Sequence, residues 1–251
     1  MSRRLPLIVA HRGDSAEFPE NSHAAFAAAL AVGVDGIELD VRLSRDGVAL
    51  VCHDADLARF GGTTRSLRKM TAAQIRAVDI GSWKHPRFAD ERVPTLDEVL
   101  VQCRRTTLCI ELKATGGRGR TVYHRRLVRM VADAIAQRKA AKRVRILCFD
   151  GGVLAEVARV APHLPRVRNC ARLPRNLPRW LKDQPGLSAA CFDRRIVTAA
   201  LVDTCHAHGV QVFSWTANDA PAADRLRQFG VDAILSDRPG WLVNHLRKRQ
   251  R

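Results

Sequence analysis

Residues 37–42 read Ile-Glu-Leu-Asp-Val-Arg, and apolar and charged side chains alternate along them. Such alternation is typical of a β-strand, in which successive side chains point to opposite faces. Glu38 and Asp40 would then share one face, and Leu39 and Val41 would face a layer of helices. The stretch therefore predicts a strand with one acidic face and one apolar face.

The same kind of unit recurs along the chain. Short apolar runs alternate with amphipathic stretches, a pattern that is typical of a parallel sheet covered by helices. Eight such units in 251 residues favour a closed barrel over a doubly wound sheet. We therefore predict one α/β domain, residues 1–251, with the TIM (β/α)₈ barrel fold. Its strands are expected to begin near Leu7, Gly36, Thr107, Val144, Val167, Ala189, Val210 and Ala233. Its helices are expected at 22–32, 123–138, 153–160, 198–208, 220–229 and 241–248.

One interval, between the second and third strands, is longer than the others. We interpret residues 47–105, approximately, as a small insertion on the face where the strands end. It contains His53, a short helix from about Thr71, and a second helix that begins after Thr95. Thr95 is expected to be the N-cap of that helix, because Glu98 follows three residues later.

Three carboxylates are predicted to meet inside the barrel. Glu38 and Asp40 lie on the second strand, and Glu111 lies on the adjacent third strand, within Cys109-Ile110-Glu111-Leu112-Lys113. Enclosed carboxylates repel each other and lose hydration unless a cation compensates them. Oxygen ligands of this kind suit Mg²⁺ or Ca²⁺. The alternatives are a first pair held by arginines or water, and a salt bridge between Glu111 and Lys113.

Two histidines follow predicted strands on the same side of the barrel. His11-Arg12-Gly13 ends the first strand, and His53-Asp54 follows the apolar run 49–52. Arginine offers a donor fork that matches phosphate oxygens, and histidine transfers protons near neutral pH. Two histidines, three carboxylates, one arginine and one lysine together suit the cleavage of a phosphodiester.

These residues belong to a longer series of motifs, in which the chain resembles the bacterial, cytosolic type of glycerophosphodiester phosphodiesterase over residues 8–240. Each motif is short, but their joint occurrence in the family's order is specific. The motifs are His11-Arg12-Gly13, Pro19-Glu20-Asn21-Ser22, Glu38-x-Asp40, Asp46-Gly47, His53-Asp54, Pro94-Thr95-Leu96, Glu111-x-Lys113, Trp215-Thr216-x-Asn218 and Ser236-Asp237-Arg238-Pro239.

The resemblance implies an activity and a cofactor. The activity would be hydrolysis of a glycerophosphodiester to glycerol 3-phosphate and an alcohol. The cofactor would be a divalent metal, Mg²⁺ or Ca²⁺, held by Glu38, Asp40 and Glu111.

The resemblance also implies roles for the basic residues. His11 and His53 would be the acid and base, and Arg12 and Lys113 would bind the phosphate. Of the two histidines, His53 is the favoured acid, since it lies on the insertion side, where a leaving group could exit. Trp215 would line the substrate pocket; its alternative is a tryptophan of the core.

The formal charge of +17, from 42 basic and 25 acidic residues, predicts attraction to anions. It equally describes an ordinary basic surface. A small phosphodiester is the expected partner, and nucleic acid is not, because no nucleic-acid-binding fold accompanies the basic residues. No stretch is long and apolar enough to span a membrane, while peripheral membrane contact and the oligomeric state stay open. Seven cysteines without paired spacing predict a reduced, cytoplasmic setting.

Two alternative functions share this fold. The first is a lysophospholipase D-type phosphodiesterase acting on lysolipids, which the positive charge would help to bring to a membrane. The second is a non-enzymatic barrel that binds phosphate esters. Both histidines argue against the second, because a binding protein needs no proton transfer.

Overall fold

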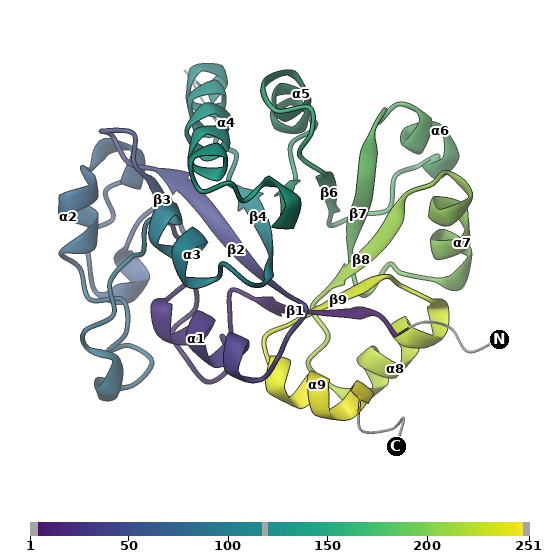
Figure 1. The fold of residues 1–251 in the computed structure, drawn as a ribbon, viewed down its shortest axis with the longest axis horizontal. Helices are drawn as coiled ribbons and strands as arrows, with labels where there is room; N and C mark the ends of the chain where they lie inside the picture. Colours follow the sequence, from purple (N-terminus) through teal and green to yellow (C-terminus); the bar gives the residue numbers. More distant parts are fainter. Residues whose placement is uncertain (1–4, 117–119, 248–251) are drawn as a thin grey trace.

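A computed structural model describes residues 5–116 and 120–247, and in this part of the chain eight parallel strands form a closed barrel surrounded by helices (Figure 1). β1 pairs with both β9 and β2, which closes the sheet. The predicted TIM barrel is confirmed. Its strands are β1 (Leu7–His11), β2 (Gly36–Leu43), β4 (Thr107–Leu112), β5 (Val144–Cys148), β6 (Arg166–Cys170), β7 (Leu187–Asp193), β8 (Gln211–Trp215) and β9 (Ala233–Ser236).

The helices that follow the strands lie on the outside of the barrel (Figure 1). They are α1 (His23–Ala31), α3 (Leu96–Gln102), α4 (Arg120–Gln137), α5 (Gly151–Val160), α6 (Leu177–Lys182), α7 (Ala199–Ala207), α8 (Ala220–Phe229) and α9 (Pro239–Arg247). The sequence did not predict α6, because six residues are too few to show a helical period. The predicted end of the last helix, Lys248, lies outside the described residues.

The alternation of residues 37–42 separates two apolar layers. Leu39 and Val41 are fully buried in the layer between the strands and the helices. On the other face, Val167, Cys191 and Phe213 fill the interior of the barrel. The seven cysteines are all buried and free, so they pack as small apolar side chains.

The connection from β2 to β4 forms a lobe beside the barrel, in blue tones in Figure 1. β3 (Ala49–Val51) pairs antiparallel with β2, which places His53 two residues beyond the end of β3. The Thr95 cap and its Glu98 partner are both present at the start of α3. The lobe also holds α2 (Ala72–Arg76) and three short 3₁₀ turns, Ala58–Phe60, Leu67–Lys69 and Pro86–Phe88.

The lobe has an apolar core of its own, which includes Leu50, Leu57, Leu67 and Ile75. None of the helices in the described residues is both long and apolar enough to cross a bilayer.

Candidate active site

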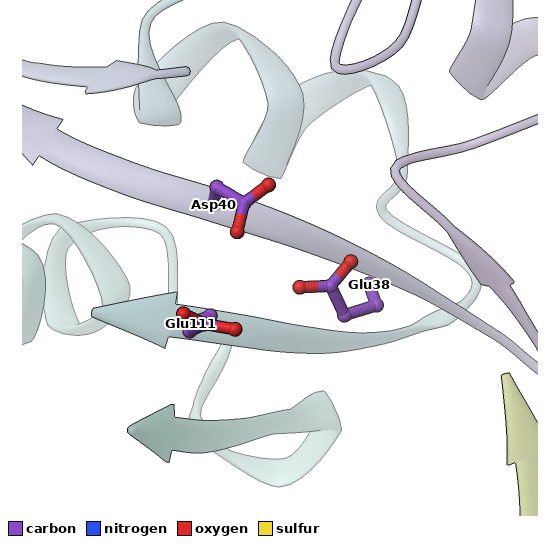
Figure 2. Close-up of side chains that lie close together, drawn as sticks. All are labelled: Glu38, Asp40 and Glu111. Atoms are coloured by element: carbon purple, nitrogen blue, oxygen red, sulfur yellow. The ribbon is translucent and has the colours of Figure 1, made fainter. Parts of the chain in front are cut away.

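Glu38, Asp40 and Glu111 come together at one end of the barrel. Figure 2 shows Glu38 and Asp40 on one strand and Glu111 on its neighbour. The register pairs Asp40 with Glu111, and one oxygen of each of the three carboxylates lies within 4.8 Å of the others. All three residues are buried, with relative exposures of 2% for Glu38, 1% for Asp40 and 8% for Glu111.

Two cations and an amide lie against Asp40. Lys113 Nζ is 2.8 Å from Asp40 Oδ1 and 2.5 Å from Glu111 Oε1. Arg12 Nε is 3.1 Å from Asp40 Oδ2, and Asn21 Nδ2 donates a hydrogen bond of 2.9 Å to the same oxygen. Burial alone would raise the pKa of Asp40, but Lys113 and Arg12 outweigh it and hold that pKa far below its usual range.

Glu38 is less well compensated than Asp40. Within residues 5–116 and 120–247, no lysine or arginine side chain forms an ion pair with it; the backbone N–H of Arg12 donates to Oε2 at 3.2 Å. Burial, and then the charge of Asp40, raise the pKa of Glu38 to about 8. Burial and Asp40 also raise the pKa of Glu111. Three buried carboxyl groups that cations compensate only in part fit a hard divalent cation such as Mg²⁺ or Ca²⁺.

His11 lies at the end of β1 with a carboxylate behind it. Its Nδ1 is 2.6 Å from Asp237 Oδ1, and Asn218 Nδ2 donates to the other oxygen of Asp237 at 2.6 Å. Its Nε2 is 3.8 Å from Glu38 Oε2. Burial lowers the pKa of His11, but the hydrogen bond to Asp237 and the charge of Glu38 outweigh it, and the pKa is raised.

His53 has a similar partner in the lobe. Its Nδ1 is 2.8 Å from Asp54 Oδ1, and Arg59 Nε donates to Asp54 Oδ2 at 2.7 Å. Arg59 Nη2 and Arg12 Nη1 both donate to Glu20 Oε1, at 2.7 and 3.1 Å. Arg59 therefore connects the His53 loop to the segment that follows β1.

The surroundings of His53 shift its pKa in the opposite direction from the pKa of His11. Burial lowers the pKa of His53, and the neighbouring cations Lys113 and Arg12 lower it further. Asp40 raises it, but the net result is a pKa below the usual value for histidine. These opposite shifts make His11 the more readily protonated of the two rings and His53 the more readily deprotonated.

A cavity of about 260 Å³ brings most of the predicted site residues together. Asp40 is not in its lining and lies behind Lys113, to which it is bound. Trp215 lines the cavity with its ring edge against Phe149, and its indole Nε1 is buried without a hydrogen-bond partner among the described residues. The predicted residues in the lining are His11, Arg12, Glu38, His53, Glu111, Lys113 and Trp215.

Several partner residues were not predicted from the sequence. Asp54 and Asp237 orient the two histidines, and both occur in motifs to which no role had been given. Asn21 likewise lies in a motif. Asn169 had no signal, because it belongs to none of the motifs and lies on the strand predicted to begin near Val167; its Nδ2 donates to Glu111 Oε2 at 3.0 Å.

Comparisons with known proteins identify relatives of this chain. A family model described as the glycerophosphoryl diester phosphodiesterase family matches residues 11–241. A glycerophosphodiester phosphodiesterase of Caldanaerobacter subterraneus is 32% identical over 96% of this chain and 98% of that protein.

Two solved structures are similar as well. The structure of a phosphodiesterase of Oleispira antarctica, in complex with the product sn-glycerol-3-phosphate, has a TM-score of 0.88 at 26% identity, covering 97% of both chains. That of a glycerophosphodiester phosphodiesterase of Agrobacterium tumefaciens has a TM-score of 0.80 at 27% identity, covering 95% of this chain and 99% of that one.

Fold and site thus define a TIM-barrel enzyme of the phosphoric diester hydrolase class. Within that class, the chain belongs to the glycerophosphoryl diester phosphodiesterase family.

Proposed function

We propose that this enzyme hydrolyses glycerophosphodiesters to glycerol 3-phosphate and an alcohol, with a divalent cation at Glu38, Asp40 and Glu111. The observation that carries the proposal is the cavity itself. It joins two histidines, each hydrogen-bonded to a carboxylate, to Glu38 and Glu111 and to the cations Arg12 and Lys113. The product complex of the Oleispira antarctica relative supports the same reaction.

Arg12 and Lys113 would bind the phosphate. Both line the cavity, and both are held in place by ion pairs to Asp40. Their charges would balance the negative charge that grows on the phosphate oxygens in the transition state. When bound to the three carboxylates, Mg²⁺ or Ca²⁺ would supply further stabilisation of that charge.

His53 and His11 would move the protons. In each ring Nδ1 is occupied by a carboxylate, so Nε2 is the atom that faces the reaction. A neutral His53 would take a proton from the nucleophile. The nucleophile is either water or a hydroxyl of the glycerol, whose attack would give a cyclic phosphate that water then opens. A protonated His11 would give a proton to the leaving alcohol. The surroundings of the two rings thus favour the reverse of the assignment made from the sequence.

A hydrolysis screen tests the proposed function. The enzyme is incubated with soluble glycerophosphodiesters and with lysolipids, with and without EDTA. The released alcohol is measured in both cases, together with glycerol 3-phosphate from the diesters and lysophosphatidic acid from the lysolipids. We expect soluble diesters to be hydrolysed and EDTA to stop the reaction. Preference for lysolipids would indicate the lysophospholipase D alternative, and binding without hydrolysis would indicate a non-enzymatic barrel.

Removal of either phosphate-binding cation should slow turnover. We expect Arg12→Ala and Lys113→Ala each to lower kcat on the order of 10²–10³-fold, the usual effect of losing one oriented donor. Lys142→Ala is a matched control, because Lys142 is exposed and precedes β5 at the opposite end of the barrel. Circular dichroism checks that each variant is folded. Normal turnover in either variant would make that residue a structural partner of Asp40.

A further inference from the structure

A second cavity, of about 560 Å³, adjoins the active site. It is formed by the segment that follows β6, together with α6, and it shares Phe149 and Asn169 with the active-site cavity. Phe149 lines both cavities, and it contacts Trp215 of the active-site cavity edge-on. A substrate whose phosphate lies in the active site can therefore extend past Phe149 into this second cavity.

The second cavity is strongly basic. Arg168, Arg172, Arg175 and Arg179 line it, and Asp183 is the acidic residue in its lining. We call it the arginine groove. In the described part of the chain, none of these four guanidinium groups is part of an ion pair. The cationic side chains are thus free to bind an anion.

Arg168 is the least exposed of the four arginines. It is half-buried at the outer side of β6, and its Nε and Nη1 atoms are enclosed without a hydrogen-bond partner among the described residues. It also lies close to the start of α5, because a Cβ added to Gly151 would be 2.7 Å from Arg168 Nη1. The Nε and Nη1 atoms are closed off from the groove, so Arg168 contributes its positive charge to an anion there rather than these donors.

Apolar side chains complete the groove. Phe149 and Leu173 are exposed by 41% and 53%, and Pro174 and Trp180 also line the cavity. Basic donors beside apolar surface suit a carbon skeleton that carries a negative group.

We propose that the arginine groove binds an anionic group, a phosphate or a carboxylate, on the alcohol moiety of the substrate. The proposal rests on the proposed function. In a glycerophosphodiester the glycerol half carries only hydroxyl groups, so a second anion must belong to the other alcohol. The enzyme would then prefer diesters whose leaving alcohol is itself charged negatively. An anionic bilayer is the competing occupant, but the groove shares Phe149 and Asn169 with the active site, as a substrate subsite would.

Two substrates that differ by one phosphate test the groove. We expect kcat/KM to be about tenfold higher for glycerophosphoinositol 4-phosphate than for glycerophosphoinositol at low salt, the scale of a hydrogen bond to a charged group. The double variant R172Q/R175Q should bring this ratio close to one, since both side chains are exposed and their removal takes charge only from the groove. The control R104Q/R105Q removes the same charge from exposed positions before β4, at the other end of the barrel, and should keep the ratio.

A binding measurement separates this proposal from the proposed function. Calorimetric titration with inositol 4-phosphate, the alcohol product, needs no turnover, and should show binding that is lost in R172Q/R175Q and kept in the control. Hydrolysis of both diesters at equal kcat/KM would overturn the proposed anion binding by the groove, while the proposed function would stay in place. Binding without any hydrolysis would overturn the proposed function and uphold the groove. If R172Q/R175Q lost binding to phosphatidylglycerol vesicles but kept its substrate ratio, the groove would be a membrane contact and the proposal would be wrong.

Discussion

Hydrolysis is expected to fall to background when divalent cations are removed with EDTA, and to return when Mg²⁺ or Ca²⁺ is added. The reason is the crowding of Glu38, Asp40 and Glu111, whose oxygens lie within 4.8 Å of one another inside the barrel. Lys113 and Arg12 compensate Asp40, but Glu38 forms no ion pair with a lysine or arginine of the described chain. The measurement is glycerol 3-phosphate release after exhaustive chelation and gel filtration, followed by titration of each cation. Full activity in the chelated enzyme would contradict the metal site.

The variant Glu38→Gln separates loss of the metal from loss of the fold. Without a cation, the raised pKa of Glu38, about 8, keeps this carboxyl largely protonated at pH 7, so the amide replaces it at little cost in stability. A bound cation stabilises the native state by mass action, and Mg²⁺ should therefore raise the Tm of the wild type. The same addition should leave the Tm of Glu38→Gln unchanged. An equal rise in both proteins would place the cation elsewhere.

The two histidine variants should differ in their dependence on the leaving group. A choline diester leaves as a basic alkoxide and needs a proton, whereas a nitrophenyl ester leaves as a weakly basic phenolate and hardly needs one. His11→Ala should therefore lose about 10²–10⁴-fold on glycerophosphocholine and keep much of its activity on the nitrophenyl ester. His53→Ala should be impaired on both substrates, because nucleophilic attack is required whatever leaves.

The pH profiles of the two histidine variants test the same acid and base assignment independently. A base must be deprotonated to act, so His53→Ala should lose the fall in kcat/KM on the acidic side. An acid must be protonated, so His11→Ala should lose the fall on the basic side. The reverse pattern would restore the assignment of His53 as the acid. Equal losses on both substrates in both variants would indicate that the histidines orient the phosphate or the metal instead.

The barrel and its acidic cluster were predictable because their causes are local. Alternation in residues 37–42 fixes which side chains share a face, whatever the rest of the chain does. Eight repeats of strand and helix then leave few topologies, and in a TIM barrel consecutive strand units are neighbours. Glu111 therefore had to lie beside Glu38 and Asp40, as the register of β2 and β4 shows.

Other parts of the site depend on contacts between distant segments. Asp237 lies 226 positions from His11, and Asn169 lies 58 positions from Glu111. Both partners come from strands or strand ends at the same end of the barrel, but no local period indicates which side chains there will meet. The conformation of the lobe decides the position of His53, since Arg59 connects its loop to Glu20.

The sequence by itself therefore determined the barrel, the acidic face of its second strand and the set of chemical groups at the site. Only the tertiary structure decided how each histidine is oriented, and that four arginines of β6, α6 and the segment between them line a groove beside the active site. The physical reason is that strand periodicity sets the direction of a side chain relative to its own backbone. Its partners, its burial and hence its charge state are set by which distant segments fold against it.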